Sequence, residues 1–255
     1  QTGRVITSPD GITWTLRTSG TTSNLNGVAW TGTQFCAVGI DSKVLTSPDG
    51  ITWTITNSGT NSALNGVVWT GTEFYTVGAQ GVLLNSPDGA VWSQLTSGTA
   101  ATLYSIDWSD ELLCAVGLTV IITSPDGDVW TDRSISGLTY NINEVVWSGT
   151  QFCAVGSAGK IITSPDGITW TVRTSGTYSA LYGVAWSGTQ FCAVGQTGRV
   201  ITSPDGITWT LRTSGEGQVF QNIVWSGTQF CAVGNAGTII TSPDGITWTP
   251  RKFIY

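Results

Sequence analysis

Residues 181–215 read LYGVAWSGTQFCAVGQTGRVITSPDGITWTLRTSG, and this stretch recurs along the chain with little change. A fixed period of about 40 residues is the signature of an architecture in which each period forms one structural unit. The tetrapeptide Ser-Pro-Asp-Gly marks seven such units, with successive aspartates 39, 39, 38, 40, 39 and 39 residues apart: Asp10, Asp49, Asp88, Asp126, Asp166, Asp205 and Asp244.

Four short segments of each period have the composition of β-strands. In the quoted stretch they are residues 182–186, 190–194, 199–202 and 207–212, and we call them strands A, B, C and D. Each is rich in β-branched, aromatic or apolar residues and is bounded by Gly, Ser, Pro or Asp. Four strands in one period form the blade of a β-propeller.

Strand B indicates how the blades pack. Residues 191–194, FCAV, are continuously apolar, whereas a sheet with one exposed face would alternate. We therefore expect every blade to be covered on both faces by its neighbours. A parallel β-helix is the alternative fold, but its coils are usually shorter, and a Pro-Asp-Gly turn suits adjacent antiparallel strands better.

The sequence thus predicts an all-β fold, a β-propeller of four-stranded antiparallel blades in one domain over residues 1–255. Residues 1–20 are identical to residues 196–215 and correspond to a C–D hairpin, after which six full repeats run from about residue 21. We expect seven blades with an incomplete first blade, and a six-bladed propeller is the alternative. The missing inner strands could be absent or come from a strand-swapped partner in a homo-oligomer.

The chain has no methionine and no leader segment, so we expect a processed form or a fragment of a longer array, and no compartment is predicted.

Residues 203–209, SPDGITW, and their six siblings resemble the Asp-box, or BNR, repeat of sialidases and photosystem assembly factors. The resemblance spans the whole chain and implies that the motif lies at the C–D hairpin of each blade. The usual box has one more residue between Asp and Gly, so a tighter turn is expected here. In that family the box is structural and occurs in enzymes and non-enzymes alike, so the resemblance implies a fold and not an activity.

Several residue types argue against catalysis and against a cofactor. The chain has no histidine, which removes the commonest general base. The sialidase resemblance would imply an arginine cluster at the propeller centre, whereas Arg17, Arg173 and Arg212 recur at one strand D position, at the outer edge of a blade. Each Ser-Pro-Asp-Gly turn offers one carboxylate, whereas Ca²⁺ takes 6 to 8 oxygen ligands. We predict no enzyme, no metal and no cofactor.

The cysteines share one position in strand B, where the second full repeat has Tyr75 in place of a sixth cysteine. Equivalent positions on stacked sheets lie about 10 Å apart, too far for a disulfide. We therefore expect buried free thiols that act as small apolar core residues. They are Cys36, Cys114, Cys153, Cys192 and Cys231.

A glycoside hydrolase is a remote alternative, because paired carboxylates could perform that chemistry. The material for it is the acidic cluster of the most divergent repeat: Asp107, Asp110, Glu111, Asp128 and Asp132.

Charge and hydropathy limit the partners. The net charge of −6 and the pI near 4.4 provide no basic surface for phosphates, so we expect no nucleic-acid partner. No apolar run approaches the roughly 20 residues that span a bilayer, so no membrane insertion is expected.

Variation among the repeats concentrates in the segments between strands D and A, which share one face of the blades with the B–C turns. These segments are residues 21–26, 60–65, 99–104, 138–143, 177–182 and 216–221. A recognition surface would vary in this way, and so would drift in unconstrained loops. The candidate ligand-binding residues are Asn26, Asn65, Tyr104, Tyr140, Tyr178, Tyr182 and Gln218.

The predicted function is a non-enzymatic binding or scaffold propeller that recognises a protein on this loop face. A multivalent carbohydrate-binding lectin is the alternative, in which avidity over similar sites would compensate for weak single sites.

Overall fold

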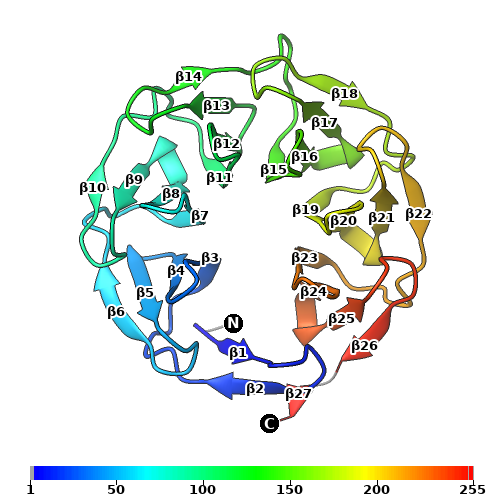
Figure 1. The fold of residues 1–255 in the computed structure, drawn as a ribbon, viewed down its shortest axis with the longest axis horizontal. Helices are drawn as coiled ribbons and strands as arrows, with labels where there is room; N and C mark the ends of the chain where they lie inside the picture. Colours follow the sequence, from blue (N-terminus) through cyan, green and yellow to red (C-terminus); the bar gives the residue numbers. More distant parts are fainter. Residues whose placement is uncertain (1–2, 252, 255) are drawn as a thin grey trace. The chain divides into compact units, whose positions relative to one another are not determined.

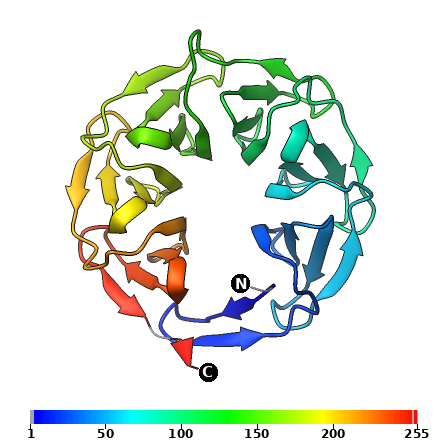
Figure 2. The same ribbon diagram turned by 180° about the vertical axis from the view of Figure 1, so that it is seen from behind.

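The computed structural model describes residues 3–251, 253 and 254. Within them, six antiparallel sheets of four strands follow one another along the chain, and we call them blades 1 to 6 (Figures 1 and 2). The predicted all-β propeller with four-stranded antiparallel blades is confirmed. The six complete blades match the six-bladed alternative, because the seventh repeat contributes its strands C and D alone.

Each blade has the strand order A, B, C, D, with neighbouring strands antiparallel. Strands A are β3 (Leu25–Trp30), β7 (Leu64–Trp69), β11 (Leu103–Trp108), β15 (Ile142–Trp147), β19 (Leu181–Trp186) and β23 (Phe220–Trp225). Strands B are β4 (Phe35–Gly39), β8 (Phe74–Gly78), β12 (Leu113–Gly117), β16 (Phe152–Gly156), β20 (Phe191–Gly195) and β24 (Phe230–Gly234).

The outer half of each blade is built from two shorter strands. Strands C are β5 (Lys43–Ser47), β9 (Leu83–Ser86), β13 (Ile121–Ser124), β17 (Ile161–Ser164), β21 (Val200–Ser203) and β25 (Ile239–Ser242). Strands D are β6 (Thr54–Asn57), β10 (Ser93–Gln94), β14 (Thr131–Asp132), β18 (Thr171–Arg173), β22 (Thr210–Arg212) and β26 (Thr249–Arg251).

The remaining elements are short. Strands β1 (Val5–Thr7) and β2 (Trp14–Arg17) form the predicted C–D hairpin, and β27 (Phe253–Ile254) is the last strand described. Four B–C turns contain a single turn of 3-10 helix, namely η1 (Ala79–Gly81), η2 (Ser157–Gly159), η3 (Gln196–Gly198) and η4 (Asn235–Gly237).

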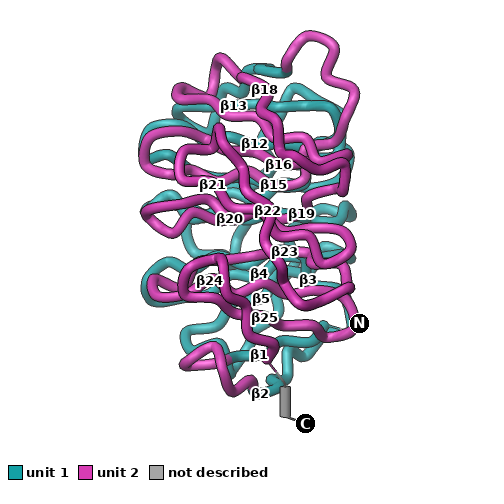
Figure 3. Tube along the Cα trace, turned by 90° about the vertical axis from the view of Figure 1, so that its right-hand side faces the viewer, with its two compact units in different colours: residues 1–7, 15–134, 255 teal, residues 8–14, 135–254 magenta. Residues whose placement is uncertain are grey.

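The chain divides into two compact units, coloured separately in Figure 3. Unit 1 comprises residues 1–7, 15–134 and 255 and contains blades 1 to 3. Unit 2 comprises residues 8–14 and 135–254 and contains blades 4 to 6. Each unit is described by itself below.

Successive blades within a unit pack face to face, as the apolar strands B predict. In unit 2, Cys192 and Val194 of β20 contact a cluster on blade 6 that includes Ile223 and Ala232. The opposite face of β20, with Phe191 and Ala193, packs on blade 4. All four β20 side chains from residue 191 to 194 are fully buried. A fully buried Phe or Val contributes roughly 1.5 to 3 kcal/mol, so this core dominates the cohesion of the blades.

The five cysteines are buried and free, as predicted. Burial raises the pKa of the Cys36 thiol to about 12 and that of Cys231 to about 11, because a buried thiolate loses its hydration. The pKa values of Cys114, Cys153 and Cys192 are raised further for the same reason.

The turn between strands C and D is longer than expected, and strand D is shorter. One carboxylate oxygen of Asp205 accepts hydrogen bonds from the backbone N–H groups of Ile207 at 2.8 Å and Thr208 at 2.9 Å. These bonds hold residues 207–209 in the turn, so strand β22 begins at Thr210 and not at residue 207. Composition alone placed β-branched Ile207 and Thr208 in the strand, but the carboxylate competes for their N–H groups.

The tryptophan of each turn donates a hydrogen bond within its own turn. The indole N–H of Trp209 donates to the carbonyl oxygen of Gly206 at 3.0 Å. Its ring centroid lies 6.3 Å from that of Phe191 in the same blade. The hydrogen bond satisfies the one polar group of the indole, which fixes the ring against its own sheet.

Candidate recognition face

A buried serine joins the D–A segment to the B–C turn of the same repeat in the repeats of Ser19, Ser97 and Ser214. The Ser97 hydroxyl donates to the carbonyl oxygen of Gly81 at 2.6 Å, and Ser214 donates to that of Gly198 at 2.8 Å. The backbone N–H of Glu216 in turn donates to the Ser214 hydroxyl at 3.1 Å. The two loops that the sequence assigned to one face are therefore adjacent within a repeat.

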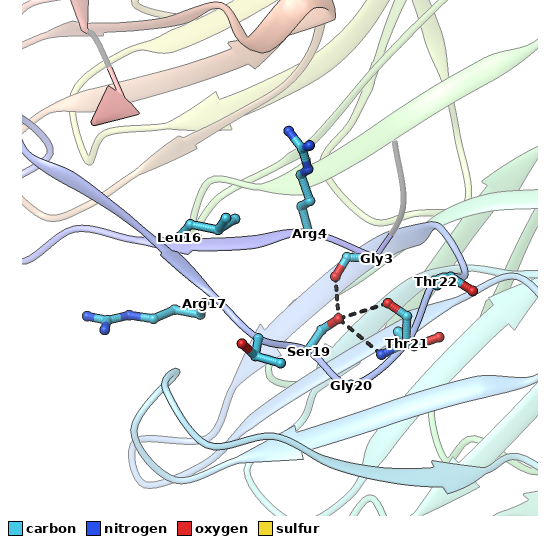
Figure 4. Close-up of a pocket in the computed structure, with 9 residues that line it drawn as sticks. Gly3, Arg4, Leu16, Arg17, Ser19, Gly20, Thr21 and Thr22 are labelled. Atoms are coloured by element: carbon cyan, nitrogen blue, oxygen red, sulfur yellow. Dashed lines mark hydrogen bonds between the residues drawn. The ribbon is translucent and has the colours of Figure 1, made fainter. Parts of the chain in front are cut away.

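Three repeats carry a hollow at this junction. The hollows have volumes of about 370, 330 and 400 Å³ and lie around Ser19, Ser214 and Ser97 respectively. Figure 4 shows the first, in which Ser19 lies between Gly3 and Thr21 and hydrogen-bonds to both. Each hollow is open to solvent and lined by the residues just before strand C, the end of strand D and the D–A segment, so it could hold a short extended group.

Arginines line two of the hollows. Arg4 and Arg17 line the first and extend outward in Figure 4, and Arg199 and Arg212 line the second. The Arg212 Nε atom donates to Thr202 Oγ1 at 2.9 Å. Among the described residues, the buried Nε atom of Arg199 has no hydrogen-bond partner. The guanidinium of Arg4, an exposed residue, can donate to a carboxylate or carbonyl oxygen of a ligand.

A β-bulge interrupts every strand A directly after its first residue. In β19 the pairing register shifts between Leu181 and Gly183, so Tyr182 has no partner in the A–B ladder. A bulge re-aims the side chain of its extra residue. The equivalent residues of the six blades are Asn26, Asn65, Tyr104, Asn143, Tyr182 and Gln221. Four of the seven predicted ligand-binding residues thus occupy one structural position.

The asparagines at this position connect neighbouring blades. The side-chain amide of Asn26 donates to the carbonyl oxygen of Leu64 at 2.8 Å, and that of Asn65 donates to Leu103 at 2.7 Å. Asn26 and Asn65 also approach each other, with Nδ2 of the first 3.5 Å from Oδ1 of the second. Asn143, which the sequence analysis did not select, makes the same bond to Leu181 at 2.7 Å. These amides have a structural role.

The predicted tyrosines and Gln218 have different surroundings. Tyr178 is 94% exposed and Gln218 is exposed, whereas Tyr104 is half-buried in β11. The hydroxyl of Tyr182 accepts a hydrogen bond at 3.3 Å from Gln196. The ammonium of Lys160 lies 5.3 Å from the ring centroid of Tyr140, a cation–π contact.

The sequence analysis missed the serine and the arginine that shape the hollows. Ser-Gly follows strand D in every repeat except the last, and its constancy looked like ordinary turn chemistry. Arg4 and Arg199 directly precede strands β1 and β21, at a position that holds Lys43, Val82 or Thr238 in other repeats. The sequence feature that could have indicated the hollows is an arginine before strand C in a repeat that also has Ser-Gly after strand D.

Two carboxylates of the acidic cluster of blade 3 lie too far apart to act as a catalytic pair in glycoside hydrolysis. Asp107 lies in β11 and Asp132 in β14, the two edge strands of one sheet. Three strand spacings of about 4.8 Å separate them by about 14 Å, beyond the roughly 5 to 9.5 Å of paired catalytic carboxylates. The part of the chain described here has no group of three or more acidic, Cys or His side chains able to hold a metal ion.

The Asp-box turns use their polar groups internally. The carboxylate of Asp205 accepts backbone N–H bonds from Thr208 and Ile207, and these bonds lower its pKa. The side chain of Gln190 in the preceding blade donates to the carbonyl oxygen of Asp244 at 2.6 Å, and Gln151 bonds Asp205 in the same way at 2.9 Å. These two turns are thereby fixed by their own repeat and by the preceding blade.

Blades of this kind define the class of protein, a β-propeller, and similar solved structures agree. YCF48 bound to a D1 peptide has a TM-score of 0.72 and 18% identity, covering 89% of this chain and 80% of that chain. YCF48 from Cyanidioschyzon merolae has the same score and identity, covering 89% and 85%. The WD40 β-propeller domain of Doa1 has a TM-score of 0.65 and 13% identity, covering 96% and 95%.

At these identities the likeness shows the fold alone, and the Asp-box type of the repeat stays a prediction. No family model matches the chain, and no curated protein matches its sequence. No helix in the described part of the chain is long and apolar enough to cross a membrane.

Proposed function

We propose that this chain is a non-enzymatic binding propeller that recognises peptide segments of a protein partner on the face formed by the D–A segments and B–C turns. The observation that carries the proposal is the recurrence of one hollow, of similar size and lining, in three repeats. The similar propeller YCF48 was solved bound to a D1 peptide, which supports a peptide ligand.

The chemistry of the hollows indicates the kind of peptide. Arg4 and Arg199 line the first and second hollows at equivalent positions, and each carries a guanidinium group, which binds carboxylates. Such sites favour peptides that carry a carboxylate or present a free backbone carbonyl oxygen. Tyr178 adds an exposed ring next to this face.

A peptide array that ranks 12-residue sequences, followed by calorimetry, tests the proposal. Acidic peptides are expected to bind, and the double variant Arg4→Met with Arg199→Met should lose at least tenfold in affinity. Arg251→Met is the matched control, because the Nε atom of Arg251 is bonded to Thr241 at 2.8 Å in strand D. The proposal is wrong if the double variant binds like the control, or if Ile207→Asp on the Asp-box turn abolishes binding instead.

A multivalent lectin is the second candidate function. The 94% exposure of Tyr178 favours it, because an exposed aromatic ring can stack on a sugar. A glycan array with calorimetry separates the two candidates. Binding at several equivalent sites would support the lectin, and the absence of a signal against any sugar would exclude it.

A further inference from the structure

One face of blade 1 exposes apolar side chains that other blades bury. Val28 of β3 is 61% exposed, whereas its equivalents Ile106, Val184 and Ile223 are 6%, 4% and 3% exposed. Each of these three is covered by the preceding blade of its unit. Trp30, on the same strand, is 45% exposed.

The hairpin of β1 and β2 lies beside this face in the position of a preceding blade. Thr7 Cγ2 lies 3.3 Å from the Cβ position of Gly50, the glycine of the next Asp-box turn. The same contact recurs between Thr202 and Gly245 at 3.1 Å. Strands β1 and β2 therefore relate to blade 1 as strands C and D of one blade relate to the blade that follows.

The edge of β1 is open. Among the described residues β1 pairs with β2 on one side only, whereas strand C of every blade pairs with both B and D. Residues 5–7 have the same sequence as residues 200–202, whose other edge pairs with β20 through Val194, Ala193 and Cys192. An unpaired strand edge beside an exposed apolar face is a site for β-strand addition.

We propose that the edge of β1 and the exposed face of β3 form an acceptor site for a β-hairpin with the chemistry of this chain's own strands A and B. The contacts of blade 5 define that chemistry. Ala185, Cys192 and Val194 of its A–B hairpin pack on the face of blade 6 that contains Ile223, the equivalent of Val28. The occupant therefore needs small or branched apolar residues at these three positions, and an extended backbone to continue the sheet from β1.

Unit 2 provides an independent observation of the same kind. Val233 of β24 is 37% exposed, whereas its equivalents Val155 and Val194 are fully buried under the next blade of that unit. The residues that cover Val155 are Val184, Phe191 and Ala193, on the other face of an A–B hairpin. On its two faces, an A–B hairpin with this sequence therefore carries the apolar side chains that would cover an exposed Val28 or an exposed Val233. This inference does not depend on the proposed peptide-binding function of the loops.

The test adds a synthetic peptide with the sequence of residues 181–195, flanked by lysines for solubility, to the full chain. Hydrogen exchange should show at least tenfold slower exchange of the β1 amides, and the unfolding temperature should rise. A control peptide with Asp at the positions of Cys192 and Val194 should do neither.

Two variants of the chain locate the site. Val28→Asp should weaken peptide binding at least tenfold, and it should fold because Val28 is 61% exposed. Val91→Asp should leave binding unchanged, because Val91 is 71% exposed in a C–D turn away from this face. Failure of the peptide to bind, binding without protection of β1, or equal affinity for the two variants would each overturn the proposal.

Discussion

The Ser-Pro-Asp-Gly turns and the D–A segments are both short, polar and rich in Gly, Ser and Thr, yet they use their polar groups differently. In the turns, the carboxylate and the serine hydroxyl form hydrogen bonds within the turn itself, as Asp205 and Ser203 illustrate. In the D–A segments, one serine fixes the backbone, and the residues around it are free to differ, as Tyr178 and Gln218 do. The turns thus use their polar groups to hold the fold, whereas the segments leave side chains such as Tyr178 exposed.

Acidification should have the largest effect on stability, because it protonates the aspartates of all seven turns. Backbone hydrogen bonds lower the pKa of every Asp-box aspartate: Asp10, Asp49, Asp88, Asp126, Asp166, Asp205 and Asp244. A carboxyl whose folded pKa is lowered stabilises the fold above its unfolded pKa of about 3.9, and this stability is lost as the pH falls through the folded value.

The unfolding temperature should therefore decrease steadily as the pH falls below about 4 at constant ionic strength. Hydrogen exchange should then increase first in the C–D turns. An unfolding temperature that stays constant between pH 5 and about pH 2.5 would show that the carboxylates contribute nothing.

Gly198→Ala should have the next largest effect, because it disrupts the close contact between the B–C turn and the D–A segment. Gly198 has a φ of +68°, and a Cβ there would lie 1.8 Å from the carbonyl oxygen of Glu216. The backbone strain and the displaced D–A segment should cost at least about 2 kcal/mol, measured by urea unfolding. Gly217→Ala is the matched control, since nothing lies within 4 Å of its Cβ position and its φ is not left-handed. Equal stabilities of the two variants would contradict the assigned contact.

Asn65→Ala should destabilise the chain by about 1 kcal/mol, because it removes a donor to the carbonyl oxygen of Leu103. Gln221→Ala, at the equivalent bulge of blade 6, removes only an exposed bond to the side chain of Asn235 and should change the stability by less than about 0.5 kcal/mol. Urea unfolding of both variants checks the difference. If Asn65→Ala instead leaves the stability unchanged and weakens ligand binding, the bulge asparagines belong to the ligand site.

Tyr178→Ala should have the smallest effect on stability, within about 0.5 kcal/mol, because its side chain is 94% exposed. If the D–A segments recognise a ligand, the same variant should weaken binding in calorimetry, with Val129→Ala on an Asp-box turn as the control. A large loss of stability would show that Tyr178 is a core residue of the segment and not a recognition residue.

Much of the fold was predictable because the period and the turn chemistry repeat. The strand order and the buried face of residues 191–194 followed from a continuous apolar run between turn residues. The start of strand D was misplaced because β-propensity gives no weight to a carboxylate that captures the N–H groups of Ile207 and Thr208. Propensity describes a residue in isolation, whereas the capture depends on the geometry of the whole turn.

The candidate site was less predictable. The sequence correctly marked the D–A segments as variable, but it could not show that Asn26 and Asn65 lie in β-bulges and donate to the next blade. A bulge changes the direction of one side chain without leaving a mark in the composition. The arginine Nε atom that lacks a partner was invisible for the same reason, since Arg199 and Arg212 look alike in the sequence and differ only in what surrounds them.

The reactivity of the five buried thiols reports how readily individual blades open. A thiol reagent attacks the thiolate, and in the folded chain burial holds each of these groups protonated and out of reach. Modification therefore has to wait until a blade opens, and one cysteine occupies the same strand B position in every blade except blade 2. Cys231 is 9% exposed whereas the other four are fully buried, so blade 6 should be the first to react. The order of labelling then reports the local stability of five sheets within one chain, with no engineered probe.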